Sequence, residues 1–277
     1  MRKDSEDIPL IPMTVEEDLK AGNVDQALSG LYERVRSAPA DAKLRRFLFQ
    51  LLCVAGKWEK ALTQLQVLND MDADSSLLAQ VFRPVIGCEM LRAEVFKGTR
   101  TALIFGEPTD WIGWLVQANT LVAEARFGPA RELRERALEV APAIAGKING
   151  QAFEWISDAD SRLGPLVEAM LDGKYFWVPF ERISRISVER PSDLRDLVWI
   201  PAKFGWRNGG ETSGFIPSRY SGSEDAAEGG IRLSRKTEWQ EREEETFCGL
   251  GQRMFSTDGG DFPLLEVQSI ELTATSN

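Results

Sequence analysis

The sequence of 277 residues predicts an α+β protein in which an α-helical repeat domain precedes a smaller, mostly antiparallel β domain. Two patterns carry this prediction. In the first half apolar residues recur at helical spacing, whereas after Gly173 short β-rich runs alternate with turn residues. No Ser-, Gly- or Pro-rich spacer separates the halves, so we expect a helical domain over residues 14–172 packed against a β-rich domain over residues 173–277. Residues 1–13, acidic and interrupted by prolines, are expected to form a disordered tail.

Capping residues predict where the first helices begin. Thr14-Val-Glu-Glu17 has the capping-box pattern, in which a threonine and a glutamate three residues later satisfy backbone N–H groups at the helix start. Asp41 can cap a helix over about residues 42–54. Trp111, Trp114 and Leu121 lie on a helix that follows a capping sequence at residues 108–110.

Two later segments are less regular. A long helix is expected to open at Asp74 or Ser75 and to run to Phe96, and Pro84 inside it should kink or split it because proline cannot donate the helical hydrogen bond. Another helix is expected near residues 165–171, ended by an Asp-Gly pair.

A repeated phrase joins the helices into units. Ala21-Gly22-Asn23-Val24-Asp25-Gln26-Ala27-Leu28 recurs as Ala55-Gly56-Lys57-Trp58-Glu59-Lys60-Ala61-Leu62, an offset of 34 residues. A more degenerate third copy is Ala125-Arg-Phe-Gly-Pro-Ala130, in which Ala125 stands at the position that glycine occupies in the first two copies. The small alanines allow two antiparallel helices to approach, and the glycine supplies the turn between them. These units resemble the tetratricopeptide repeat family.

The second half reads as a β domain. Turn-forming sequences such as Asp258-Gly-Gly-Asp261 separate the short runs rich in β-branched and aromatic residues. These runs lie at residues 175–179, 183–188, 197–200 and 264–270.

Composition excludes several function classes. The chain has no histidine, which removes the commonest general base and metal ligand, and we expect neither a metal site nor a cofactor. The net charge of -10 argues against nucleic acid and against an anionic membrane surface. With neither a secretory signal nor a run of apolar residues long enough to span a membrane, the chain is expected in the cytoplasm. Three widely spaced cysteines fit buried thiols.

Candidate chemistry is confined to the second half. Arg253, among glycines, could bind a carboxylate, and the alternative is an internal ion pair with Asp193 or Asp196. Trp177 and Trp199 could belong to a stacking site in the same domain, and the alternative is packing in the core. The acidic run over residues 238–245 could act as acid and base or hold a divalent ion, and the alternative is a solvated charged face.

Several motifs in one order resemble the ImpE/TagJ family. They are Gly173-Lys-Tyr-Phe-Trp-Val-Pro-Phe180, Leu194-Arg-Asp-Leu-Val-Trp-Ile-Pro201, Ile216-Pro-Ser-Arg-Tyr-Ser-Gly222, Arg232-Leu-Ser-Arg-Lys-Thr-Glu-Trp239 and Gly249-Leu-Gly-Gln-Arg253. The resemblance spans about residues 19–272. It implies a non-enzymatic cytoplasmic adaptor of a type VI secretion system that binds the amino-terminal helix of the small sheath subunit TssB and is linked through it to the ATPase ClpV.

Repeat geometry adds candidate contacts for such a helix. The first helix of each pair would line the binding face, with packing inside the repeats as the alternative for the apolar members. The nominated residues are Arg45, Leu48, Phe49, Leu52, Trp111, Trp114 and Leu121. Two other hypotheses stay open: a repeat scaffold with different partners, and an enzyme built from Arg253 and the acidic run. A groove on the β domain also remains possible for the partner.

Overall fold

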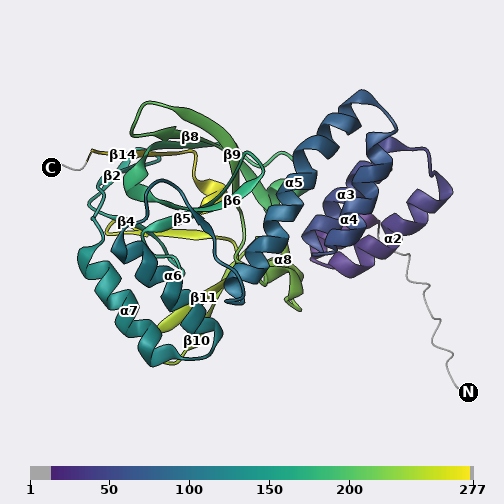
Figure 1. Cartoon of the computed structure of the whole chain (residues 1–277). Helices are drawn as coiled ribbons and strands as arrows, with labels where there is room; N and C mark the ends of the chain where they lie inside the picture. Colours follow the sequence, from purple (N-terminus) through teal and green to yellow (C-terminus); the bar gives the residue numbers. More distant parts are fainter. Residues whose placement is uncertain (1–13, 275–277) are drawn as a thin grey trace, which may run out of the picture.

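The computed structural model describes residues 14–274, so the expected tail at residues 1–13 lies outside the described chain. Figure 1 shows helices α2–α5 on one side, a body of strands on the other, and α6 and α7 lying against the strands. The helices are α1 (Val15–Ala21), α2 (Val24–Ser37), α3 (Ala42–Val54), α4 (Trp58–Asn69), α5 (Ala73–Phe96), α6 (Asp110–Ala123), α7 (Phe127–Val140) and the short α8 (Gly229–Arg232). The α+β prediction is confirmed.

The starts of α1 and α3, predicted from Thr14 and Asp41, are confirmed. Thr14 and Glu17 form the capping box of α1, and the Asp41 carboxylate accepts hydrogen bonds from the first turn of α3. In the two repeat units the turn glycines Gly22 and Gly56 adopt left-handed backbone angles, with φ of 85° and 65°. Ala125 takes the same conformation between α6 and α7, with φ of 58°, although an alanine pays a steric cost there.

The long helix differs from expectation in two ways. Its N-cap is Asp72, whose carboxylate accepts a hydrogen bond from the Ser75 N–H at 2.7 Å, so α5 begins slightly earlier than predicted. Sequence predicts a kink or a split at Pro84; the helix runs through Pro84 without a break, so a split is wrong. Pro84 lies on the exposed side, while Phe82 and Ile86 keep the opposite side buried in the core.

The strands form three sheets within residues 14–274, and every pairing except that of β1 with β6 is antiparallel. The largest has the order β1-β6-β5-β9-β8-β7-β14-β2-β3; β10 pairs with β11, and β12 lies between β13 and β4. Their bounds are β1 Leu103–Ile104, β2 Gly146–Ile148, β3 Gln151–Phe153, β4 Ile156–Asp158, β5 Leu166–Leu171, β6 Lys174–Pro179, β7 Ile183–Val188, β8 Trp199–Trp206, β9 Glu211–Pro217, β10 Thr237–Arg242, β11 Thr246–Gly251, β12 Met254–Thr257, β13 Gly260–Pro263 and β14 Ser269–Leu272.

The helix predicted at residues 165–171 is wrong, because Leu166–Leu171 is the strand β5. All six of its residues are buried, and a short apolar run of this kind suits a central strand as well as a helix. Asp172 and Gly173 both have positive φ and form the tight turn of the β5–β6 hairpin. Asp-Gly is a strong hairpin signal, so the pair marks a hairpin turn here and not the expected helix end.

Strands also begin earlier than the predicted change of period near residue 172. The last long helix, α7, ends at Val140, and β2 starts at Gly146. The third helix pair, α6 and α7, does not stack on the second pair, α3 and α4. Instead, α6 packs against the large sheet, where Trp111 and Leu115 share a core with Met170 and Tyr175 (Figure 1).

The second half of the chain caps the ends of the repeat helices. Arg235 donates to the Leu19 and Lys20 carbonyls at the end of α1, and Arg219 donates to the Cys53 and Val54 carbonyls at the end of α3. Carbonyls at a helix C-terminus lack intrahelical partners and carry a partial negative charge, which a cation stabilises. These contacts bind the helices to the strands without a linker.

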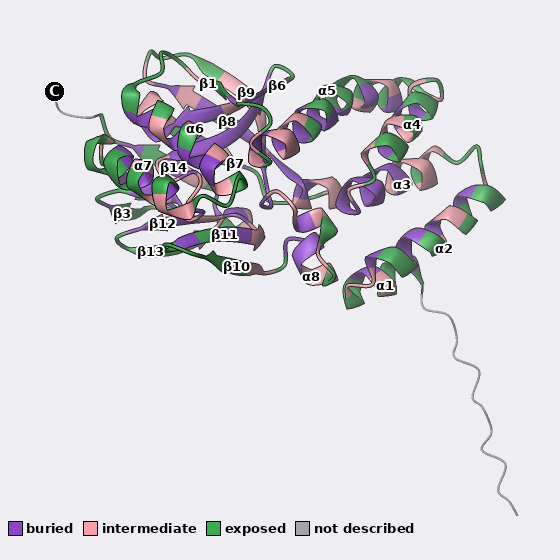
Figure 2. Cartoon of the chain, turned by 60° about the horizontal axis from the view of Figure 1, so that its bottom comes forward, coloured by how far each residue is buried: buried purple, intermediate pink, exposed green. Residues whose placement is uncertain are grey.

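Two apolar cores result. One spans helices α1–α6 and one face of the large sheet, and the other lies among the strands of the second half. Figure 2 shows buried residues concentrated on the strands and on the inward sides of the helices. The helices and strands therefore share one continuous interface rather than meeting at a hinge.

Candidate functional site

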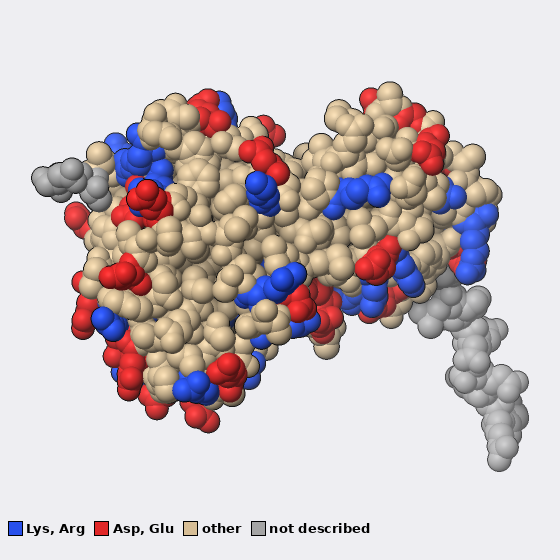
Figure 3. Space-filling view, viewed as in Figure 1, with Lys and Arg blue, Asp and Glu red and all other residues tan. Residues whose placement is uncertain are grey.

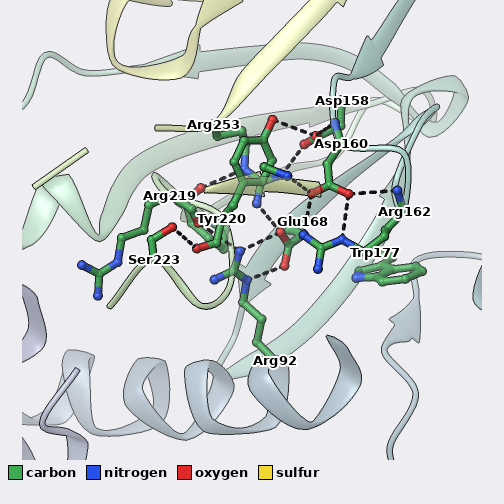
Figure 4. A network of polar contacts seen from close by, with 12 residues as sticks. Arg92, Asp158, Asp160, Arg162, Glu168, Trp177, Arg219, Tyr220, Ser223 and Arg253 are labelled. Atoms are coloured by element: carbon green, nitrogen blue, oxygen red, sulfur yellow. Dashed lines mark hydrogen bonds and ion pairs between the residues drawn. The ribbon is translucent and has the colours of Figure 1, made fainter. Parts of the chain in front are cut away.

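A buried network of charges lies where α5 meets the strands (Figure 4). Glu168 of β5 receives two hydrogen bonds from Arg92 of α5, at 2.5 and 3.0 Å, and a further ion pair from Arg253. Arg253 also pairs with Asp158 of β4 and donates to the Pro217 carbonyl at 2.9 Å. Arg92, Glu168 and Arg253 are each at most 1% exposed, so the network is closed to solvent.

The two candidate tryptophans belong to the same network. Trp199 donates its indole N–H to Glu89 at 2.8 Å, and Glu89 in turn pairs with Arg92 at 2.9 Å. Trp177 donates to the Tyr175 hydroxyl at 2.7 Å, which donates to Glu168. The sequence therefore grouped three residues that the structure does bring together, but as buried links between helix and sheet.

The pKa values reflect this burial. Desolvation would raise the pKa of Glu168, but Arg92 and Arg253 outweigh it and hold that pKa at about 2. Desolvation dominates for Asp158 and raises its pKa to about 6 against the pull of Arg253. Glu168 is thus an anion at neutral pH, and it pairs with two arginines.

The internal ion pair proposed for Arg253 exists, but with other partners. Asp158 and Glu168 neutralise Arg253, whereas Asp193 and Asp196 form a capping box on the 3-10 turn Leu194–Leu197. An enzyme at Arg253 needs an open pocket with an unpaired carboxylate. The guanidinium is fully buried and its carboxylates are engaged, so the hypothesis loses its best support.

Sequence reasoning missed the other members of the network. Glu89 and Arg92 lie in the apolar second half of α5, and Glu168 interrupts the apolar run of β5. A charge inside an otherwise buried run is the signal that could have found them, because such a charge needs a buried partner.

Most of the nominated peptide-binding residues lie in the core. The apolar members other than Trp114 are at most 8% exposed: Leu48, Phe49, Leu52, Trp111 and Leu121. Phe49 packs against Phe82 of α5, with ring centroids 5.8 Å apart. The Gln50 amide donates to Asp193, so the strand half of the chain covers this part of α3.

Two nominated residues keep part of their surface exposed. Arg45 donates to the Pro39 carbonyl at 2.6 Å and to Gln64 at 3.1 Å. Trp114 is half-buried, and the Arg136 guanidinium stacks 3.9 Å from the centre of its ring. A partner can reach these two side chains without disturbing the core.

The acidic run forms an exposed hairpin. Its glutamates lie on β10 and in the turn before β11, where Glu244 and Glu245 contact Arg131 of α7. This agrees with a solvated face. Figure 3 shows acidic and basic side chains interspersed over one face of the molecule, without a large patch of a single sign.

A hollow of about 470 Å³, which we call the α5 groove, lies at the junction of helices and strands. It lies between the start of α4, the end of α5 and the loop after β9. Its lining residues are Gly56, Trp58, Met90, Ala93, Glu94, Phe96, Lys97, Arg162, Ser221, Gly222, Glu224 and Asp225.

Residues 14–274 contain no cluster of three or more Cys, Asp or Glu side chains arranged to hold a metal ion. No helix in the same range combines the length and apolar character needed to cross a membrane. The three cysteines are buried, free thiols whose pKa values are raised by desolvation.

Comparison with known proteins gives a consistent match. The ImpE protein family model matches residues 150–271. A Pseudomonas aeruginosa protein, type VI secretion system accessory component TagJ, is 44% identical over 265 residues, which cover 96% of this chain and 93% of that protein. The crystal structure of protein VPA1032 from Vibrio parahaemolyticus has a TM-score of 0.86 at 26% identity and covers 94% of this chain and 98% of that one.

Proposed function

The chain belongs to the ImpE/TagJ family of type VI secretion accessory proteins, and from that premise we propose that it is a non-enzymatic adaptor for the contractile sheath. Its partner in this proposal is the amino-terminal helical segment of the small sheath subunit TssB. Through that subunit it is linked to ClpV, the ATPase that handles contracted sheath. We place this activity in the cytoplasm.

The observation that carries the proposal is the extent of the match. Identity of 44% over 96% of the chain includes both the repeat helices and the strands. The buried side of α5 and its ion network depend on both parts at once, so the family match covers a single folded unit. The burial of Arg253 supports the non-enzymatic part of the proposal, because the best candidate for a reactive cation is already neutralised.

The contact residues nominated from repeat geometry stay a prediction. Of these, Arg45 and Trp114 are the ones that a partner helix can touch in the described conformation. The buried members would support such a surface from behind. The repeat-scaffold alternative predicts the same exposed residues but a different partner.

A direct binding measurement tests the proposal. Isothermal titration of the full-length protein with a synthetic TssB amino-terminal peptide should give a dissociation constant in the micromolar range or tighter. A scrambled peptide of equal composition is the control. If neither the cognate peptide nor peptides from related sheath subunits bind, the adaptor proposal is wrong and the scaffold alternative gains support.

A further inference from the structure

We infer that a second hollow, the α2–α4 groove, is a carboxylate-binding site, and that the chain's own acidic residues Asp4, Glu6 and Asp7 occupy it. The groove has a volume of about 330 Å³. Its lining residues are Tyr32, Arg36, Leu52, Lys60, Thr63 and Gln64. Figure 1 shows α2, α3 and α4 together on the far side of α5 from the sheet, so the site is remote from the strands. The inference goes beyond the proposed function and does not depend on it.

The lining of the groove supplies cations and hydrogen-bond donors but no carboxylate. Lys60 is exposed, and its ammonium nitrogen lies 5.7 Å from the centre of the Tyr32 ring. The other cation of the lining, Arg36, pairs with Glu33 at 2.6 Å, whereas Lys60 has no ion pair within residues 14–274. The charge of Lys60 is therefore available to an anion that enters the groove.

The Tyr32 hydroxyl is a second group without a partner. Its oxygen is buried, and it forms no hydrogen bond among the described residues. A buried hydroxyl that lacks a partner is costly, and an ionised carboxylate can only accept hydrogen bonds. A carboxylate in the groove would accept from Tyr32 and pair with Lys60 at the same time. Leu52, which is fully buried, gives the site an apolar wall that strengthens such a pairing relative to open solvent.

The described chain begins close to this groove. Glu16 in the first turn of α1 pairs with Arg34 in the last turn of α2 at 3.0 Å, so the two helices are antiparallel. Thr14 therefore lies beside the end of α2 that lines the groove. Asp7 is seven positions before Thr14 and Asp4 is ten, which allows a reach of about 23–33 Å. An α-helix with its side chains is only about 10–12 Å across, so these residues can pass around α2.

Charge and attachment both favour the chain's own segment as the occupant. Asp4, Glu6 and Asp7 place three carboxylates within four positions, all outside the described residues. Arg2 and Lys3 are farther from α1 and can remain in solvent. Single exposed ion pairs are weak, so a free carboxylate would fill the groove only at high concentration. A segment joined to the start of α1 has an effective concentration on the order of millimolar, which lets weak contacts form.

Zero-length cross-linking of the full-length protein with a carbodiimide tests the inference, because it joins carboxylates to lysine amines that are in contact. Lys60 should cross-link to Asp4, Glu6 or Asp7 within the monomer, with a yield that does not change on tenfold dilution. Lys43 is the matched control, since it is exposed at the same end of the repeats, has no ion pair within residues 14–274 and does not line the groove. Its yield should be at least fivefold lower.

Two sets of variants sharpen the test. Lys60→Glu combined with Glu6→Lys should give a cross-link between the two exchanged positions, because the charges remain complementary. Tyr32→Phe removes only the hydroxyl and should lower the yield at Lys60 at least twofold. Circular dichroism and melting temperature confirm that every variant is folded.

Three results would overturn the inference. Equal yields at Lys60 and Lys43 would indicate chance collisions. A yield unchanged by Tyr32→Phe would place the carboxylates outside the groove. Cross-links found only in a dimer would assign the groove to a second copy of this chain. None of these results bears on binding of the TssB peptide, so the adaptor proposal is tested separately.

Discussion

At the scale of single residues, Glu168 is the carboxylate that pairs with two buried arginines. It neutralises Arg92 and Arg253 at once, in a place where neither arginine has access to water. Removing one member of a buried ion pair leaves an uncompensated charge, which costs far more than the pair itself contributes. The ion pair between Arg92 and Glu168 thus makes the stability of α5 depend on that of β5.

Glu168→Gln should lower the free energy of unfolding at pH 7 by about 3–5 kcal/mol, measured by urea denaturation. Because the folded state holds the pKa of Glu168 at about 2, below its usual value of 4.5, the carboxylate stabilises the fold above pH 4.5. That contribution is lost as the pH falls from about 4.5 to about 2. The difference in unfolding free energy between Glu168→Gln and the unchanged protein should therefore become smaller as the pH falls.

Glu33→Gln is the matched control for this change. Glu33 pairs with Arg36 at 2.6 Å on the surface of α2, where both side chains are mostly exposed. A surface pair contributes at most about 1 kcal/mol, so this variant should remain close to the unchanged protein. The network would be unimportant for stability if Glu168→Gln lowered the free energy of unfolding no more than the control does. The same would follow if the difference from the unchanged protein did not depend on pH.

At the scale of elements, the turns between the repeat helices pack closely against the second half of the chain. A side-chain carbon at Gly56 would lie 2.7 Å from the Glu224 Cβ, and φ there is +65°. At Gly22 the tight approach is from the other side, because a side-chain carbon at Gly229 would lie 1.7 Å from the Gly22 carbonyl oxygen. The glycines that the repeat pattern places between helices therefore also allow the second half of the chain to approach.

Gly56→Ala and Gly87→Ala should have opposite effects on melting temperature. The first imposes a left-handed conformation on alanine, which costs about 1–2 kcal/mol, in addition to the close contact with Glu224. Gly87 lies on the exposed side of α5 with nothing within 4 Å, so alanine should stabilise the helix by about 0.5–1 kcal/mol. Equal shifts for the two variants would contradict this account.

At the scale of the whole molecule, helices and strands should unfold together. Arg219 and Arg235 cap helices from which they are separated by more than 150 residues of sequence, and Arg92 reaches Glu168 across the same interface. Differential calorimetry should show one transition whose calorimetric and van't Hoff enthalpies agree. A fragment of residues 14–99 should be largely unfolded, since it lacks these caps. Two separate transitions, or a stable fragment, would show independent domains.

Much of the fold could be predicted from local sequence. Repeated alanines and glycines set α1–α4, and Thr14 and Asp41 set two of their starts, because capping and turn formation depend on neighbours a few residues away. Family membership was also readable, since several motifs occur in one order along the chain. Local signals failed at β5, where an Asp-Gly turn after a short apolar run fits a helix end as well as a hairpin.

The sequence by itself thus determined the two-part α+β architecture, the family and the absence of histidine chemistry. Only the tertiary structure decided which charges meet, because Arg253 finds Asp158 and Glu168 across 95 and 85 residues, distances over which no local pattern acts. The tertiary structure also decided which helix faces remain exposed to solvent. A residue such as Phe49 carries the same sequence signal whether it faces a partner or, as here, the chain's own α5.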